Sequence, residues 1–120
     1  MMPWRVEFYV GADKRAPVEE FLEHLPADRR AKLVAVVHLL AREGPSLPFP
    51  YSSQVSGRLR ELRTQHGKEK LRIFYFADTN RTFVLLHAFI KRTAKAPAED
   101  IDIAAGRMRI HEVRVERSKR

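Results

Sequence analysis

The chain contains no cysteine, and this absence removes several classes of chemistry at once. Without cysteine there can be no disulfide framework, no cysteine-ligated zinc site and no thiol nucleophile. The sequence also lacks a phosphate-binding glycine-rich loop, a Gly-x-Ser-x-Gly motif and a dinucleotide-binding fingerprint. Nucleotide-cofactor chemistry and serine hydrolysis are therefore disfavoured, and we expect no cofactor.

Long apolar runs and metal-binding patterns are missing too. No stretch approaches the uninterrupted apolar length of a membrane helix, and charges interrupt the apolar residues at the N-terminus as they would not in a leader peptide. We therefore expect a cytoplasmic protein with no membrane partner, folded as a single domain over residues 1–120. The histidines are scattered without ligand spacing, which predicts no metal site.

Negative charge is scarce in the second half of the chain. Residues 1–57 hold seven Lys and Arg against seven Asp and Glu, whereas residues 58–120 hold sixteen against eight. The whole net charge of +8 therefore lies in the second half. Basic side chains that neutralise phosphates release counterions and gain affinity, so a polyanion is the expected partner. Nucleic acid comes first and an anionic membrane surface second, and we predict nucleic acid rather than a membrane.

The first half of the chain predicts one strand and two helices. Residues 4–10 alternate with aromatic and β-branched side chains, as a strand does. A short helix begins at Pro17, and a second begins near Pro26 and stops at Gly44 and Pro45. Residues 46–57, rich in serine and proline, read as a connector between elements.

The second half predicts three strands in an antiparallel meander, followed by a helix. The strands cover residues 58–64, 70–77 and 82–90. The helix begins at Pro97, and residues 111–120 read as a charged tail that frays. The predicted class is α+β in the order β-α-α-β-β-β-α. We expect a small, twisted, mainly antiparallel sheet with its helices on one face and a concave basic surface on the other.

Alternation along the strands singles out Arg72. It shares a face with Phe74 and Phe76, and burying a cation there is costly unless it has a partner or a function. Tyr75 falls on the opposite face, where it reads as a core aromatic or a site phenol. In the third strand, alternation groups His87 with Phe83, Leu85 and Phe89, and a histidine in an apolar run is more often a satisfied core residue than a catalyst.

Cations on rigid strands beside aromatic rings suit a phosphodiester and its bases, because guanidinium groups bind phosphate oxygens and rings stack on bases. Each of these cations has the alternative reading of a solvated strand residue. The candidates for RNA binding are Arg58, Arg60, Arg63, Lys68, Lys70, Tyr75 and Lys95. Lys91, Arg92 and Lys95 follow the third strand closely, where a loop can aim them at a ligand.

Five motifs occur in an order that resembles the phage-derived, HigB-like branch of the RelE/ParE toxin superfamily. They are "PVEEFLEHLP", a helix ending in "GP", "LRELR", "RIFYF" and "VLLHAFIKRTAKAP". The resemblance implies a RelE-like fold and a ribosome-dependent endoribonuclease that cuts mRNA. It also implies a cognate helix-turn-helix antitoxin (HigA-like) as partner, with the ribosome and mRNA. Arg72 then matches the arginine that contacts the scissile phosphate, Lys91 and Arg92 match the basic pair after the next strand, and Arg63 matches a backbone contact.

The mechanism that the resemblance implies needs no metal, because the RNA 2′-hydroxyl attacks the neighbouring phosphate. Arg72, with Lys91 or Arg92, would stabilise the charged transition state. Glu61, His87 or a lysine would transfer the proton, and the sequence does not choose among them. Two other functions stay open: a non-catalytic RNA- or DNA-binding module on the same scaffold, and a ParE-like gyrase inhibitor.

Overall fold

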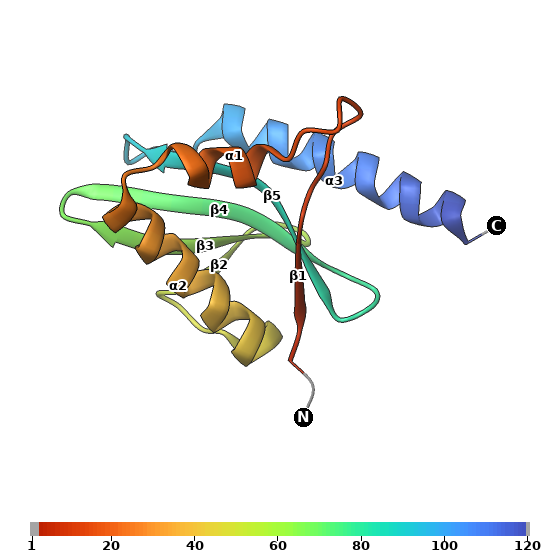
Figure 1. The fold of residues 1–120 in the computed structure, drawn as a ribbon, viewed down its shortest axis with the longest axis horizontal. Helices are drawn as coiled ribbons and strands as arrows, with labels where there is room; N and C mark the ends of the chain where they lie inside the picture. The colour runs from red at the N-terminus through yellow and green to blue at the C-terminus, as the bar shows by residue number, and fades with distance from the viewer. Residues whose placement is uncertain (1–2, 120) are drawn as a thin grey trace.

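The computed structural model describes residues 3–119, which fold into a five-stranded sheet with helices on both faces (Figure 1). The strand order is β1-β5-β4-β3-β2. The strands are β1 (Arg5–Phe8), β2 (Ser52–Ser56), β3 (Leu59–His66), β4 (Glu69–Asp78) and β5 (Thr82–Lys91). β1 is parallel to β5 and the other neighbours are antiparallel, so the sheet is mainly antiparallel, as predicted.

Three α-helices and one short 3-10 turn complete the fold. They are α1 (Pro17–His24), α2 (Ala27–Glu43), η1 (Gly44–Ser46) and α3 (Ala98–Ser118). Pro17 is the first residue of α1, and α2 ends directly before Gly44 and Pro45, so both sequence signals are confirmed. The predicted α+β class is confirmed as well. Within residues 3–119, no helix combines the length and apolarity needed to cross a membrane.

The sheet carries a hydrophobic core on each face. The first core lies under α1 and α2 and includes Leu33, Leu40, Leu62, Leu71, Ile73 and Tyr75. The second lies under α3 and includes Leu59, Phe74, Phe76, Val84, Leu86 and Ala104. The expectation that all helices share one face was wrong, because β4 and β5 carry large apolar side chains on both faces and each face needs cover. Only part of the α3 face is left for a basic surface.

A β-bulge in β5 changes which side chains share a face. Leu86 is an extra residue relative to β4, so alternation is interrupted there. Phe83 and Leu85, before the bulge, pack in the first core, whereas Phe89, after it, packs in the second. Constant alternation predicted that these three residues share a face with His87, and this was wrong. The bulge moves His87 and Phe89 onto the face of α3.

The predicted connector contains a fifth strand. β2 lies inside residues 46–57 and pairs with β3, so the observed order is β-α-α-β-β-β-β-α. Ser52 is buried, and its hydroxyl is hydrogen-bonded to the hydroxyl of Tyr75 at 2.6 Å. Backbone pairing and this buried polar contact stabilise β2. Its sequence has no apolar alternation that would indicate a strand.

The helix α3 continues through residues expected to form a charged tail. It extends to Ser118 and projects past the sheet toward the C-terminus (Figure 1). Arg58 forms an ion pair with Glu112, and Arg114 Nη1 donates to the carbonyl of Val10 at 2.5 Å. These contacts tie the second half of α3 to the sheet side of the molecule. Met1, Met2 and Arg120 of the predicted domain lie outside the described residues.

We expect Gly44→Ala to lower the free energy of unfolding by about 2–4 kcal/mol. Gly44 has a φ of +69°, and a Cβ there would lie 2.8 Å from Trp4 Nε1. The Trp4 ring is itself stacked on Phe83, with 4.5 Å between centroids, so it has little room to move. Gly57→Ala is the matched control, because its φ is +55° with nothing within 4 Å. Equal losses for the two variants in denaturant titration would contradict the role of Trp4.

Asp78 provides a pH-dependent tie between β4 and α3. It accepts hydrogen bonds from His111 Nε2 at 3.0 Å and from the Thr79 backbone N–H at 2.7 Å. Burial alone raises the pKa of the Asp78 carboxyl, but these hydrogen bonds and the charge of His111 together lower it below its ordinary value of 3.8. A carboxyl whose pKa is lower in the folded than in the unfolded state stabilises the protein when the pH is above its unfolded-state pKa. This stabilisation is lost as the pH falls through the folded-state pKa.

We therefore expect Asp78→Asn to cost about 1 kcal/mol of unfolding free energy near neutral pH, and the cost to shrink below about pH 4. Denaturant titrations of wild type and variant across this range measure the difference. The exposed Asp102 of α3 gives the charge-matched control Asp102→Asn. A cost for Asp78→Asn that stays constant with pH would contradict the assignment.

Candidate functional site

The register of β3, β4 and β5 gathers cations on the α3 face, near the turn that joins β3 and β4. Arg63 of β3 pairs with Arg72 of β4, which pairs with Phe89 of β5. In the next row toward the turn, Lys70 pairs with Lys91. Residues paired directly across strands share a face and lie close together. We call Arg63, Lys70, Arg72 and Lys91 the cationic patch.

Arg72 is the buried member of the patch, with 4% of its surface exposed. Its Nη1 donates to the carbonyls of Leu71 at 3.0 Å and Thr64 at 3.2 Å. Its Nε is buried and has no hydrogen-bond partner within the described structure. Burial, followed by the charge of Arg63, lowers the pKa of the Arg72 guanidinium, while Glu61 opposes the shift. Arginine keeps its proton at physiological pH, so the site holds a positive charge that an anion would stabilise.

Glu61 lies between the two arginines of the patch. Its Oε1 accepts hydrogen bonds from Arg63 Nη1 at 2.8 Å and from the Ser53 hydroxyl at 3.0 Å. Its Oε2 lies 3.9 Å from Arg72 Nε, which is an ion pair without a hydrogen bond. Ser53 lies in the segment expected to be a connector, and no local pattern in the sequence indicated that it faces Glu61.

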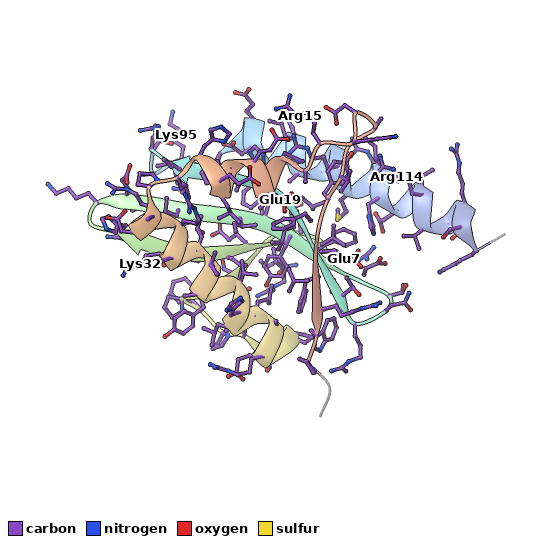
Figure 2. The ribbon with its side chains drawn as sticks, in the orientation of Figure 1. Glu7, Arg15, Glu19, Lys32, Lys95 and Arg114 are labelled. Carbon is purple, nitrogen blue, oxygen red and sulfur yellow. The ribbon has the colours of Figure 1, made fainter. Side chains whose placement is uncertain are left out.

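The loop after β5 extends the basic surface. Lys91 Nζ donates to the carbonyl of Thr93 at 2.5 Å, and Arg92 and Lys95 are exposed. Lys95 lies at the same end of the molecule as the turn between β3 and β4 (Figure 2). A cavity of about 290 Å³ separates this loop from the first turn of α3, where Glu99 lies. The predicted cluster of Lys91, Arg92 and Lys95 therefore shares Lys91 with the cationic patch and continues from it into the loop.

His87 lies under the first half of α3. Its Nε2 is 2.7 Å from Asp100 Oδ1, its Nδ1 is 3.3 Å from Arg107 Nη1, and its ring stacks on Phe89. Both ring nitrogens thus have neighbours within the fold, and only 15% of the side chain is exposed. This geometry suits a histidine that anchors α3. Its role in proton transfer stays a prediction.

Four other predicted RNA contacts lie outside the patch. Tyr75 is buried in the first core on the opposite face, so its assignment to RNA binding was wrong. Arg60 also lies on that face, where its Nη2 donates to the Ser52 hydroxyl at 3.1 Å. Arg58 lies over the Phe76 ring at 5.2 Å and pairs with α3. Lys68 is exposed in the turn between β3 and β4.

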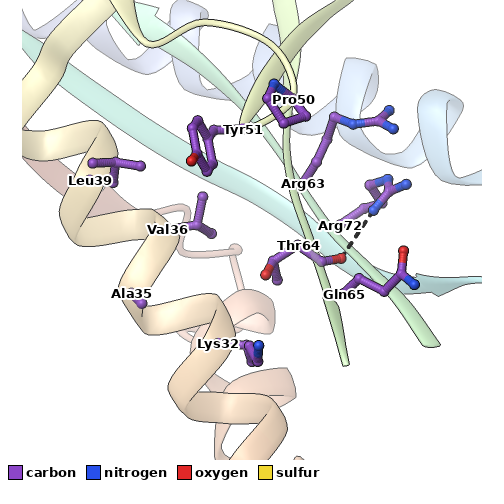
Figure 3. Close-up of a pocket in the computed structure, with 10 residues that line it drawn as sticks. All are labelled: Lys32, Ala35, Val36, Leu39, Pro50, Tyr51, Arg63, Thr64, Gln65 and Arg72. Carbon is purple, nitrogen blue, oxygen red and sulfur yellow. Dashed lines mark hydrogen bonds between the residues drawn. The ribbon is translucent and has the colours of Figure 1, made fainter. Parts of the chain in front are cut away.

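A groove of about 400 Å³ borders the patch, between α2 and the end of β3 (Figure 3). Val36 and Leu39 of α2 line one side with Tyr51, and Arg63 and Arg72 belong to the other. An apolar space beside guanidinium groups suits a planar ring attached to an anionic backbone. Within residues 3–119, no three His, Asp or Glu side chains come together as a metal site requires.

Residues 20–109 match the family described as "Phage derived protein Gp49-like (DUF891)", a family associated with RelE- and HigB-like toxins. The matched segment contains the whole cationic patch together with Ser53 and Glu61. No curated protein matches the chain. Since the match spans well over half of the sequence, this chain belongs to the phage-derived Gp49-like family.

Proposed function

We propose that this protein is the toxin of a type II toxin-antitoxin system, of the HigB-like branch with a RelE-like fold, and that it cleaves mRNA on the ribosome. The observation that supports this best is the buried Arg72 inside a cationic patch, because no described residue accepts a hydrogen bond from its Nε. A scissile phosphate supplies the missing acceptor. A basic surface alone is compatible with many anionic partners, and membership of a family associated with toxins favours RNA among them.

The proposed reaction needs no metal. The 2′-oxygen bonds to the adjacent phosphorus and the bond from phosphorus to the 5′-oxygen breaks, which gives a 2′,3′-cyclic phosphate and a 5′-hydroxyl. The proton leaves the 2′-hydroxyl and another reaches the departing 5′-oxygen. Arg72, with Lys91 or Arg92, stabilises the negative charge that builds up on the phosphate. Such preorganised electrostatic stabilisation contributes about 3–4 kcal/mol per donor in comparable sites.

The proposed partners follow from this function. The substrate is mRNA in the ribosome, which places the protein in the cytoplasm. A cognate helix-turn-helix antitoxin (HigA-like) holds it inactive until the antitoxin is removed. A neighbouring reading frame for such a protein, whose expression relieves growth arrest by this chain, would support the pairing. Growth arrest that the neighbour does not relieve would count against it.

Primer extension on mRNA from an in vitro translation reaction tests the proposal. The expected result is a set of cuts that requires both this protein and ribosomes. A parallel reaction that contains the mRNA and the protein without ribosomes is the control. Intact mRNA with active ribosomes would contradict the nuclease assignment, and DNA damage in cells without RNA cuts would favour a ParE-like gyrase inhibitor instead.

One observation favours a second candidate, a non-catalytic RNA- or DNA-binding module. Both carboxylate and imidazole candidates for proton transfer are engaged within the fold, Glu61 by Ser53 and Arg63, and His87 by Asp100. A proton-transfer group must reach the reacting atom, directly or through one water. Binding of RNA through Arg72 without ribosome-dependent cuts would establish this second function.

A further inference from the structure

The Glu61 carboxylate lies between the two arginines of the cationic patch. Among the described residues it is flanked by Arg63 at 2.8 Å and Arg72 at 3.9 Å, and the Ser53 hydroxyl donates to it from β2. Arg63 and Arg72 are direct cross-strand neighbours, so their charges repel. Glu61 therefore compensates two adjacent cations with one internal negative charge.

This compensation is incomplete at Arg72. The contact from Glu61 Oε2 to Arg72 Nε exceeds hydrogen-bond length, and within residues 3–119 that buried Nε has no hydrogen-bond partner. Oε1, by contrast, receives two hydrogen bonds. The carboxylate is thus held toward Ser53 and Arg63, and Arg72 keeps one donor for an acceptor from outside.

We propose that Glu61 is a positioning residue that occupies the phosphate site in the empty protein, and that an RNA phosphate displaces it. The incoming phosphodiester accepts from Arg72 Nε and takes Arg63 from Glu61, while the Ser53 hydroxyl retains the released carboxylate. Glu61 is then a competitor of the substrate rather than its proton acceptor. This inference rests on the proposed RNA-binding function. It adds that competition from Glu61 sets the affinity of the site for RNA.

Removal of the Glu61 charge should strengthen RNA binding. Glu61→Gln keeps the size of the side chain and an oxygen that accepts from Ser53, but the site gains one unit of positive charge. At separations of about 4 Å, one charge corresponds to roughly a fivefold change in affinity in water. Ser53→Ala changes no charge but removes the hydroxyl that holds the carboxylate away from Arg72 and retains it after displacement. We therefore expect a smaller effect of the opposite sign, a loss of about twofold in RNA affinity. A general base at position 61 predicts a different result: lost cleavage with unchanged affinity.

The experiment measures binding of a short fluorescein-labelled single-stranded RNA to the full chain by anisotropy, at one fixed salt concentration. The charge-matched control is Glu19→Gln, which removes an exposed carboxylate on α1, on the opposite face of the sheet (Figure 2). Affinity for Glu61→Gln above that of Glu19→Gln supports the inference. Equal affinities for these two variants, or cleavage lost with no gain in affinity, would overturn it.

Arg72→Ala separates this inference from the proposed function. If Arg72→Ala binds RNA as tightly as wild type, the RNA site itself is misplaced and both ideas fail. If Arg72→Ala binds weakly but Glu61→Gln binds no better than Glu19→Gln, only the role of Glu61 fails. Thermal unfolding checks that each variant is folded. Should Glu61→Gln not fold, Ser53→Ala decides: a loss of RNA affinity in the folded variant supports the inference, and an unchanged affinity overturns it.

Discussion

Replacing Arg72 by alanine is expected to lower the rate of ribosome-dependent mRNA cleavage by about 10²–10³-fold. The Arg72 guanidinium is held by the carbonyls of Leu71 in β4 and Thr64 in β3, and its buried Nε has no hydrogen-bond acceptor among the described residues. A donor placed in advance stabilises transition-state charge without reorganisation, so its loss affects the chemical step directly. Single-turnover cleavage of ribosome-bound mRNA, followed by primer extension, measures the rate.

Two variants make the Arg72 result interpretable. Arg72→Lys keeps the charge but loses the guanidinium geometry, and we expect an intermediate rate. Arg42→Ala removes an arginine on α2 whose side chain is 73% exposed, so it controls for net charge. A cleavage rate for Arg72→Ala within a fewfold of Arg42→Ala would remove Arg72 from the mechanism. Arg72→Ala could also lose cleavage because it folds less stably. We would draw that conclusion if Arg72→Ala unfolded at a lower temperature than wild type while Arg72→Lys kept full activity.

Phe76→Ala is expected to lower the free energy of unfolding by about 3–5 kcal/mol. Phe76 is fully buried in the second core, with its ring near His111 of α3 and under Arg58. The truncation removes apolar contacts and leaves a cavity between β4 and α3. Hydrogen exchange should show the largest loss of protection in α3, because that helix closes the second core.

The aromatic control for this prediction is Phe49→Ala. Phe49 is 68% exposed and its ring contacts Arg63, so we expect a cost below about 1 kcal/mol. Denaturant titration compares the two variants. Similar costs for Phe49→Ala and Phe76→Ala would contradict the second core, and with it the correction that places α3 on its own face of the sheet.

Much of the fold follows from local patterns in the sequence. The helical spacing after Pro17, the stop at Gly44 and the apolar strands after Gly57 each depend on a few neighbouring residues, and each is confirmed. Local patterns failed where stability depends on distant partners. β2 is polar and pairs through its backbone with β3, and the Ser52 contact to Tyr75 spans 23 residues. A window of about 11–18 residues, the length over which periodicity is recognised, cannot contain both partners of such a contact.

Local patterns also predicted one part of the candidate site and missed another. Arg72 stood out in the sequence because a cation inside an apolar strand needs compensation. Arg63, Lys70 and Lys91 were candidates too, but no local pattern placed them beside Arg72, because cross-strand partners depend on register. Arg63 lies beside Arg72 through the turn at Gly67, and Phe89 reaches the same face only because of the bulge at Leu86. A bulge shifts the alternation of all later residues in its strand, and it is visible only in the pairing with the neighbouring strand.

Composition and the spacing of nearby residues were sufficient to predict the α+β class, the basic second half and a cation at Arg72 that requires compensation. Contacts between distant segments were needed to place α3 on its own face, Tyr75 in the core and Glu61 between two arginines, where Ser53 holds it. Burial, register and ion pairing depend on segments far apart in the chain, because these segments meet only when the sheet forms.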